Sequence, residues 1–347
     1  MSRLGEALRC RAPLPAAEAM AEALYHPRLG YYRKEEGPWG FANKDYYTAL
    51  DCGPLMGLTL AVRLERVWTE LGCPGVFTVL EPGAGRGWLG RDLLASATGA
   101  FGRALRYIHR DGSPAARRSA EAALAPWLGS GQARLVEEDE PLTPFEGAVV
   151  SNELFDALPA QPYRFRGGHW ERELLMSEGS NWEPVARDEA VAWFEGAGIP
   201  EEGDGSVWCP SLPAVLAHNV AALGRGAFIA IDYGGSTGEL LEKGADLRRY
   251  RAHRVDGRWW EDLGEADLTA DVDFTRLATL LEGERFEGIR TRSLSTWVRE
   301  HAPLSRWEAD WQELEPRERL ARMQNLMQLT LPNLMGERFR VLEGLRA

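Results

Sequence analysis

GVFTVLEPGAGRGWLGRDLL, residues Gly75–Leu94, decides the fold of this chain. The apolar run that ends at Leu80 predicts a short buried parallel strand. Glycines then recur at every second position from Gly83 to Gly87, and an apolar pattern with helical spacing follows from Trp88. Glycine permits positive φ and lets a ligand approach the backbone, while a helix start offers unpaired N–H groups. The stretch therefore predicts a strand, a ligand-binding glycine turn and a helix.

Two kinds of ligand compete for this turn. Gly85, Gly87 and Gly90 satisfy G-x-G-x-x-G, which suggests a dinucleotide, but the first of these glycines lies well past the strand end. The alternative motif, E-x-G-x-G-x-G, begins with Glu81 at the strand end. A carboxylate there favours S-adenosylmethionine, which carries an ammonium and a sulfonium, and would repel a pyrophosphate. We favour S-adenosylmethionine, with a plain strand-to-helix turn as the alternative. The expected cofactor-binding residues of this turn are Glu81, Gly83, Ala84, Gly85 and Gly87.

Composition limits the possible partners. The chain has 347 residues, of which 44% are hydrophobic and 27% are charged, as is usual for a globular protein. Its net charge of −12 disfavours nucleic acid as a main partner. The four cysteines are scattered and lack nearby histidine pairs, so we expect no metal site and no disulfide framework. There is no apolar run of about eighteen residues and no signal-peptide core, so we expect no membrane span.

The next strands carry further cofactor candidates. Leu105–Asp111 predicts a second strand that ends in a carboxylate, at the place where a βαβ unit meets a ribose. Ser113 then caps a helix, and Ala133–Val136 predicts a third strand. Acidic residues directly after this strand are candidates for the adenine amino group, although a solvated charge run is the alternative. The candidates of this region are Asp111, Ser113, Glu137 and Glu138.

The expected chemistry lies after the fourth strand. Gly147–Ser151 is apolar and runs directly into N-E-L-F-D-A-L-P. Asn152, Glu153 and Asp156 are polar residues within this otherwise apolar segment. A buried carboxylate is costly unless it is paired, and a doubly wound sheet places its ligands at the carboxyl ends of its strands. We therefore predict these three residues as catalytic, with Asn152 also touching the cofactor.

The remaining segments suggest additions to a central sheet. We expect helices at Pro15–Leu24 and Gly53–Leu71, with an aromatic turn at Tyr25–Tyr32. A β-hairpin is expected after Gln161 and a fifth strand at Gly226–Asp232. The segment from Ala245 to Asp273 is polar and irregular, which suggests a lid or binding loop. The last two strands are expected at Phe286–Leu294 and Glu337–Leu345.

Several of these motifs together resemble one family. N-E-L-F-D-A-L-P at Asn152–Pro159 and G-E-A-D-L-T at Gly264–Thr269 are its specific segments, and the glycine turn and Ile231–Gly234 extend the match over nearly the whole chain. The chain resembles the MidA-like S-adenosylmethionine-dependent methyltransferases, whose mitochondrial members are arginine methyltransferases needed for the assembly of respiratory complex I. The sequence departs from the family pattern at Lys44–Thr48, in the glycine turn and at Asp111, where the family usually has glutamate.

The resemblance implies the architecture. We expect an α/β fold with a doubly wound, Rossmann-like methyltransferase sheet of seven mostly parallel strands, including an antiparallel last strand. Residues 1–72 would form an N-terminal helical cap. Residues 73–347 would form a class I methyltransferase domain with insertions at about 160–210 and 235–273, where a β-hairpin and a loop would form the substrate side.

The resemblance also suggests the reaction, which is methyl transfer to an arginine of a protein. Carboxylates would have to hold the planar guanidinium, and Glu153 and Asp156 are the first candidates, with support from the long loop. The expected substrate-side residues are Tyr32, Tyr47, Thr48, Asp232, Tyr233, Glu265 and Asp267.

Three alternatives stay open: a methyltransferase of small molecules, a non-catalytic assembly protein that keeps the cofactor site, and an NAD-dependent dehydrogenase. The last lacks a candidate hydride-transfer acid. Because the family motifs begin near Ala23, we expect no transit peptide and a bacterial cytoplasmic location. The oligomeric state is left open, with a dimer as one option.

Overall fold

The structure is a computed structural model that describes residues 2–35 and 49–347, so the predicted substrate residues Tyr47 and Thr48 lie outside the described residues. The chain forms two compact units that alternate along the sequence. The described residues of the first unit are 2–35, Phe155–Val215 and Tyr233–Thr279. Those of the second unit are 49–154, Leu216–Asp232 and Leu280–Ala347. The expected division into a cap of residues 1–72 and a domain of residues 73–347 stays a prediction.

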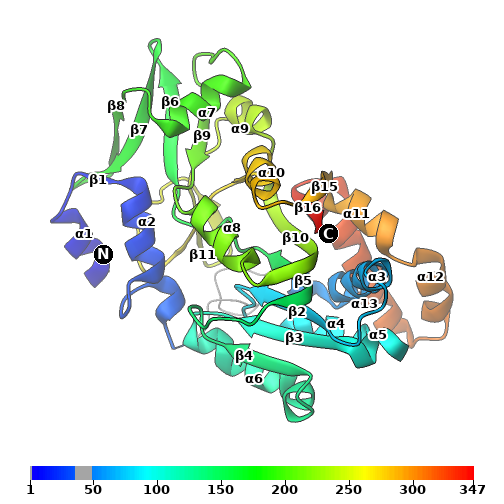
Figure 1. Ribbon diagram of the computed structural model, residues 1–347. Coiled ribbons are helices and arrows are strands. Elements are labelled where there is room, and N and C mark those ends of the chain that lie inside the picture. The colour runs from blue at the N-terminus through cyan, green and yellow to red at the C-terminus, as the bar shows by residue number, and fades with distance from the viewer. Residues whose placement is uncertain (1, 36–48) are drawn as a thin grey trace. The chain divides into compact units, whose positions relative to one another are not determined.

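A central sheet organises the second unit (Figure 1). Its strand order is β15-β16-β10-β5-β2-β3-β4, and the short strand β14 pairs with the end of β10. The pairs from β10 through β5, β2 and β3 to β4 are parallel, whereas β15 and β16 are antiparallel. This order confirms the doubly wound methyltransferase sheet with an antiparallel last strand. The bounds are β2 Phe77–Pro82, β3 Leu105–Arg110, β4 Ala133–Val136, β5 Phe145–Asn152, β10 Leu223–Gly235, β14 Val272–Asp273, β15 Glu287–Ser293 and β16 Phe339–Arg346.

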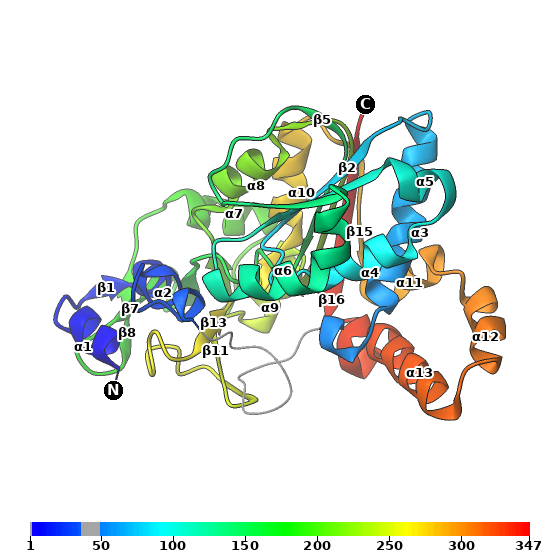
Figure 2. The ribbon, with the colours of Figure 1, turned by 90° about the horizontal axis from the view of Figure 1, so that it is seen from below.

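Helices cover this sheet. Leu55–Glu70 forms α3, which packs on α4 (Trp88–Ser96), and α4 packs in turn on α6 (Pro114–Gly129). Figure 2 shows α4 and α6 side by side below the sheet. Ser113 caps α6 as expected, because its side chain accepts the Ala116 N–H. Further helices of the second unit are α5 Gly99–Ala104, α11 Leu294–His301, α12 Leu304–Gln312 and α13 Pro316–Thr330, with short turns η2 Ala49–Cys52 and η3 Pro332–Gly336. Two helices, α8 Leu212–Val220 and α10 Phe274–Gly283, begin in a segment of the first unit and end in a segment of the second.

One glycine of α4 sets how closely this helix approaches the sheet. A Cβ at Gly90 would lie 2.1 Å from Cζ of Tyr107, a residue of β3. Only glycine leaves room there for the tyrosine ring, which is buried. The third glycine of the G-x-G-x-x-G pattern therefore has a packing function, which it would also have in a dinucleotide-binding fold.

The first unit contains two further sheets. The larger has the order β1-β7-β6-β9, with β8 pairing with β7. Strands β6 and β7 form the hairpin expected after Gln161, with Gly167 and Gly168 in its turn. Its apolar core packs α2 against these strands and against Trp259. The bounds are α1 Arg3–Arg9, β1 Leu14–Pro15, α2 Ala16–Tyr25, η1 Tyr31–Arg33, β6 Gln161–Arg166, β7 His169–Leu175, β8 Ser180–Pro184, α7 Glu189–Ala197, β9 Gly205–Trp208 and α9 Thr237–Lys243.

The smaller sheet corrects one expectation. The segment from Ala245 to Asp273 is only partly irregular, because β11 (Arg248–Arg251) pairs with β12 (Arg254–Asp256) and β13 (Asp267–Thr269). Residues 257–266 form no helix or strand. Its many charged residues hid the strands from an analysis of apolar alternation. Arg249 of β11 is buried and ion-paired with Asp256, so charge pairing replaces apolar packing here.

No helix in residues 2–35 or 49–347 has both the length and the apolar character needed to cross a bilayer.

Gly90→Ala tests the packing of α4 on Tyr107. We expect the new methyl group to push the ring or the helix away and to lower the free energy of unfolding by about 1–3 kcal/mol. The matched control is Gly129→Ala at the end of α6, where an added Cβ meets nothing within 4 Å. Urea unfolding would measure both variants. An unchanged midpoint for Gly90→Ala would contradict the packing that the structure shows.

Candidate active site

The glycine turn after β2 is closed by Asp111. Gly83, Gly85 and Gly87 have φ values of +64°, +51° and +69°, which are left-handed conformations that favour glycine. The N–H of Gly85 donates to Asp111 Oδ2 over 2.8 Å, and the N–H of Ser113 donates to Oδ1 over 2.7 Å. Asp111 therefore joins the glycine turn, the end of β3 and the start of α6 through one carboxylate.

The turn is crowded on one side and open on the other. A Cβ at Gly83 would lie 2.7 Å from the side chain of Leu154, and one at Gly87 would lie 3.1 Å from Ala120 in α6. A Cβ at Gly85 would meet nothing within 4 Å. The backbone at Gly85 therefore faces space that a ligand can enter.

Glu81 lies buried at the end of β2. The hydroxyl of Tyr107 donates to its Oε2 over 2.5 Å. Burial, opposed by this hydrogen bond and assisted by the negative charge of Asp111, raises the pKa of Glu81 to about 8. The carboxyl group is therefore poised to ionise when a cation arrives.

Asn152 is the last residue of β5, and Glu153 follows it with unusual geometry. Glu153 has a φ of +51°, which is strained for a residue with a side chain, and its N–H donates to the Ile231 carbonyl over 2.9 Å. The side-chain amide of Asn152 donates to Glu153 Oε1 over 3.1 Å. The other amide atom, Asn152 Oδ1, is buried and has no hydrogen-bond partner among the residues that the structure describes. A buried acceptor without a partner needs an explanation, and a ligand that donates a hydrogen bond is one.

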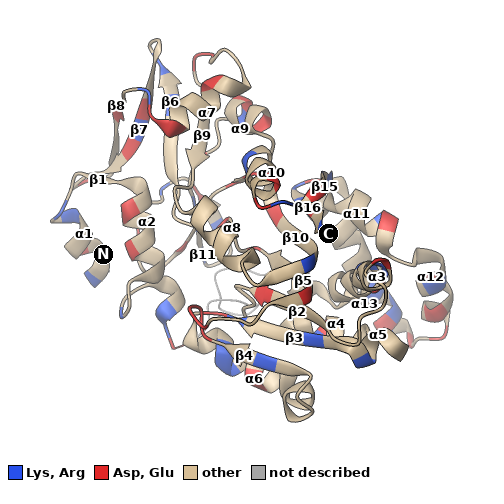
Figure 3. Cartoon of the chain, in the orientation of Figure 1, with Lys and Arg blue, Asp and Glu red and all other residues tan. Residues whose placement is uncertain are grey.

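Three further predicted residues lie in the same unit. Asp232 has a buried side chain. It directly follows Ile231 of β10, and Ile231 pairs with Asn152 of β5. Glu137 and Glu138 are exposed in the acidic segment after β4, which is visible in Figure 3, and Glu137 is ion-paired with Arg117 of α6.

The first unit holds Asp156 and four of the expected substrate residues, namely Tyr32, Tyr233, Glu265 and Asp267. Asp156 is buried and accepts a short hydrogen bond from the hydroxyl of Tyr233. Burial raises the pKa of Asp156 to about 6, against the opposing effects of Tyr233 and the positive charge of Arg248. The guanidinium of Arg248 lies 5.1 Å from the centre of the Tyr233 ring. A carboxylate with this pKa can accept a proton near neutral pH.

The other substrate candidates of this unit are engaged with the aromatic turn. The hydroxyl of Tyr32 donates to Oδ1 of the buried Asp267 over 2.7 Å. Lys34 forms an ion pair of 2.7 Å with the exposed Glu265. The structure therefore joins the G-E-A-D-L-T segment to the aromatic turn.

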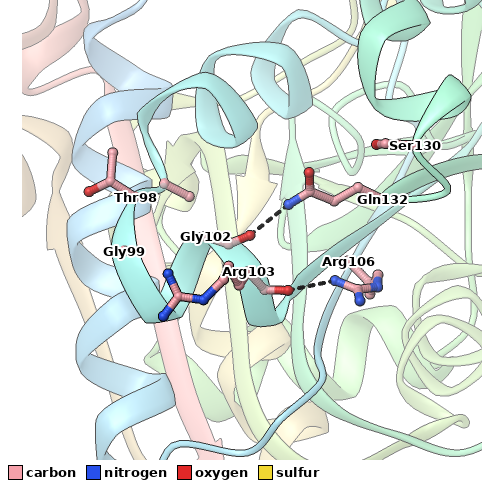
Figure 4. A pocket seen from close by; sticks show the side chains of 8 residues that line it. Thr98, Gly99, Gly102, Arg103, Arg106, Ser130 and Gln132 are labelled. Atoms are coloured by element: carbon pink, nitrogen blue, oxygen red, sulfur yellow. Dashed lines mark hydrogen bonds between the residues drawn. The ribbon is translucent and has the colours of Figure 1, made fainter.

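A polar cavity of about 520 Å³ lies at the start of β3 (Figure 4). Gln132 donates to the Gly102 carbonyl over 2.7 Å and Arg106 donates to the Arg103 carbonyl over 2.9 Å. In open α/β sheets ligands bind at the carboxyl ends of strands, and this cavity lies at the amino end of β3. It is therefore no candidate for the cofactor.

The prediction missed three polar residues of β3. Tyr107, His109 and Arg110 are all buried, and each makes a polar contact with a segment at the site. The signal was present, since histidine and arginine inside a parallel strand are unusual. Among residues 2–35 and 49–347, no group of three or more histidine, cysteine or acidic residues is arranged to hold a metal ion.

Comparisons with known proteins place the chain in a family. A family model described as “Putative S-adenosyl-L-methionine-dependent methyltransferase” matches residues 59–289, which is more than half of the chain. The chain belongs to this family of S-adenosylmethionine-dependent methyltransferases. A crystal structure from Burkholderia thailandensis, bound to S-adenosyl-homocysteine, is 25% identical with a TM-score of 0.87 and covers 99% of this chain and 92% of that one.

Two curated relatives of this methyltransferase are mitochondrial proteins. The Drosophila melanogaster homolog of protein arginine methyltransferase NDUFAF7 is 25% identical over 313 residues, which cover 78% of this chain and 67% of the relative. Protein arginine methyltransferase NDUFAF7 of Homo sapiens is 25% identical over 386 residues, which cover 96% of this chain and 80% of the relative. The resemblance to the MidA-like family and the expected cofactor are thereby confirmed.

Glu81→Gln tests the raised pKa of this buried group. Between pH 4.5 and about 8 the unfolded chain has an ionised Glu81 while the folded chain keeps the proton. The contribution of Glu81 to the free energy of unfolding of the wild type should therefore fall as pH rises through this window. The fall is at most about 1.4 kcal/mol per pH unit. The Gln variant lacks this contribution, so its stability relative to the wild type should increase with pH.

Urea unfolding at several pH values measures this difference. The control is Glu146→Gln. Glu146 lies at the amino end of β5, opposite to the end that carries Asn152, and forms an exposed ion pair with Arg225. A difference between Glu81→Gln and the wild type that stays constant from pH 5 to pH 8 would contradict the raised pKa.

Proposed function

We propose that S-adenosylmethionine, the cofactor of this family, binds in the second unit at the carboxyl ends of β2, β3 and β5. The proposal is supported by the open side of the turn at Gly85 and by the buried Asn152 Oδ1, an acceptor that a ligand donor would satisfy. Each Asp111 oxygen accepts one backbone N–H and keeps acceptor capacity for a ribose hydroxyl. These groups fit a nucleoside that carries several hydrogen-bond donors.

Glu81 would contribute charge to this site. The carboxyl group is fully buried beside the turn, and its raised pKa shows that ionisation without a cation is unfavourable. A bound ammonium or sulfonium would stabilise the ionised form. Cofactor binding would then release a proton from Glu81 below about pH 8.

We further propose that the methyl acceptor is an arginine side chain of a protein. The observation that carries this proposal is the carboxylate of Glu153, held at the end of β5 by a strained backbone and by the amide of Asn152. Strain of this kind persists where the surrounding structure fixes the residue, and it is common at active sites. The names of the curated relatives support arginine as the acceptor.

The bound cofactor supplies an electrophilic methyl group. Glu153 would hold the planar guanidinium of the acceptor and orient one nitrogen, a task that suits a carboxylate. As the new C–N bond forms and the C–S bond breaks, the acceptor nitrogen loses a proton. Asp156, whose buried carboxyl group has a pKa of about 6, stays the candidate proton acceptor of this proposal.

The remaining assignments of this function are also proposals. Asp232 and Tyr233 at the end of β10, Tyr32 and the pair Glu265 and Asp267 would contribute to the substrate side, and Glu137 and Glu138 to the adenine side. A bacterial cytoplasmic location also stays part of the proposal.

Glu153→Gln tests the assignment of the acceptor-binding carboxylate. We expect at least a hundredfold loss of methyl transfer, because the amide cannot hold the guanidinium by charge, while affinity for S-adenosyl-homocysteine stays within a few-fold. The assay uses methyl-labelled S-adenosylmethionine with a protein extract of cells that lack the gene, followed by acid hydrolysis and amino-acid analysis. The control Glu146→Gln changes the same residue type at the far end of β5 and should keep full activity.

Label recovered as methylarginine supports the acceptor class. Label found in another amino acid would contradict arginine as the acceptor. Label found only in the small-molecule fraction would also contradict it and would favour a small-molecule methyltransferase. Unchanged turnover of Glu153→Gln would refute the role of Glu153.

A further inference from the structure

The last residues of β3 are polar although the strand is buried. His109 and Arg110 are 0% and 4% exposed. Successive side chains of a strand point to opposite faces, so these two residues lie on opposite sides of the sheet. Burying polar groups is unfavourable unless they find partners, and the partners of both residues are backbone carbonyls of the loops that flank β3.

His109 holds the glycine turn together with Asp111. His109 Nε2 lies 2.8 Å from the carbonyl oxygen of Gly85, while Asp111 accepts the Gly85 N–H over 2.8 Å. Burial lowers the pKa of His109, so the ring is neutral and carries one proton. Nδ1 has no partner among the described residues, and we infer that the proton sits on Nε2 and is donated to Gly85. The carbonyl of Gly85 is thereby bound to His109 of β3, and its N–H is bound to Asp111, the residue directly after β3.

The turn needs this support because of its composition. Three of the five residues from Gly83 to Gly87 are glycines, which lose more conformational freedom on ordering than any other residue. If the turn were ordered only by the ligand, part of the binding free energy would be lost to this ordering. Hydrogen bonds from β3 order the turn before the ligand arrives.

Arg110 makes the equivalent contact on the other face. Its Nη2 donates to the Glu140 carbonyl over 2.8 Å, and its Nη1 lies 3.3 Å from His218 Nε2. The same nitrogen of His218 lies 3.3 Å from the Glu138 carbonyl. The acidic side chains of Glu138, Asp139 and Glu140 offset the charge of the buried guanidinium. Arg110 therefore holds the acidic segment that follows β4 through the Glu140 carbonyl. Nε2 of His218 either accepts from Arg110 or donates to the Glu138 carbonyl, since one ring nitrogen cannot do both.

We propose that His109 and Arg110 are positioning residues that hold the two loops on either side of β3, the glycine turn and the segment Glu137–Glu140, in the arrangement that binds the adenosine part of the cofactor. Neither residue touches the ligand in this proposal. The inference rests on the proposed cofactor site, since it assigns these two loops to the ligand's surroundings.

Local hydrogen exchange in the cofactor-free protein tests the positioning without any ligand. His109→Leu removes the donor to Gly85, and exchange should rise about tenfold in peptides that cover residues 83–87 but not in those that cover 137–140. Arg110→Met keeps the alkyl chain without the guanidinium, and it should produce the reverse pattern. His109→Gln retains a side-chain N–H and should restore protection of the turn.

Calorimetric titration with S-adenosyl-homocysteine completes the test. The Kd should rise about tenfold for His109→Leu and return to within threefold of the wild-type value for His109→Gln. Exchange and Kd both unchanged in His109→Leu, or exchange raised equally throughout the sheet, would overturn the positioning role. If the wild type fails to bind S-adenosyl-homocysteine, the proposed cofactor site is wrong, while the exchange pattern still decides whether β3 holds the two loops.

Discussion

The carboxylate of Asp111 makes the two hydrogen bonds on which the arrangement of the site depends. One oxygen accepts the N–H of Gly85 and the other accepts the N–H of Ser113, so a single side chain joins the glycine turn to the first turn of α6. A carboxylate binds backbone N–H groups more strongly than a neutral acceptor does. Because the turn is rich in glycine, it has little conformational preference of its own, and its shape has to come from neighbours. Those neighbours are the side chains that end β3.

The glycine pattern alone does not decide the ligand. Gly85, Gly87 and Gly90 match a dinucleotide fingerprint, and the last of them is required by Tyr107, whose ring occupies the place of a Cβ. Close packing of this kind is common to both kinds of fold. Tyr107 in turn donates to Glu81, the buried acid of the alternative motif. A buried acid that ionises when a cation binds beside it suits a cationic cofactor, whereas an anionic pyrophosphate would not stabilise its ionised form. Electrostatics therefore favours the cofactor of the family to which the chain belongs.

Much of the second unit could be predicted because its strands are apolar runs that end in polar residues. β2, β4 and β5 were predicted in this way. The same reasoning placed Asn152 and Glu153 at the carboxyl end of β5. The contacts of His109 and Arg110 could not be predicted, because they join residues that are far apart in sequence and depend on the face of β3 that each occupies. Strands β11 to β13 were missed because ion pairs such as Arg249 with Asp256 stabilise them in place of apolar alternation. The pKa of Asp156 depends on burial, which no local pattern reports.

The central claim is that the carboxyl ends of β2, β3 and β5 form a site for S-adenosylmethionine and not for a dinucleotide. Calorimetric titration of the wild-type protein with S-adenosylmethionine and, separately, with NAD tests it most directly. The account predicts binding of S-adenosylmethionine at micromolar concentration and no heat of binding with NAD. Binding of NAD, or binding of neither compound, would contradict the claim.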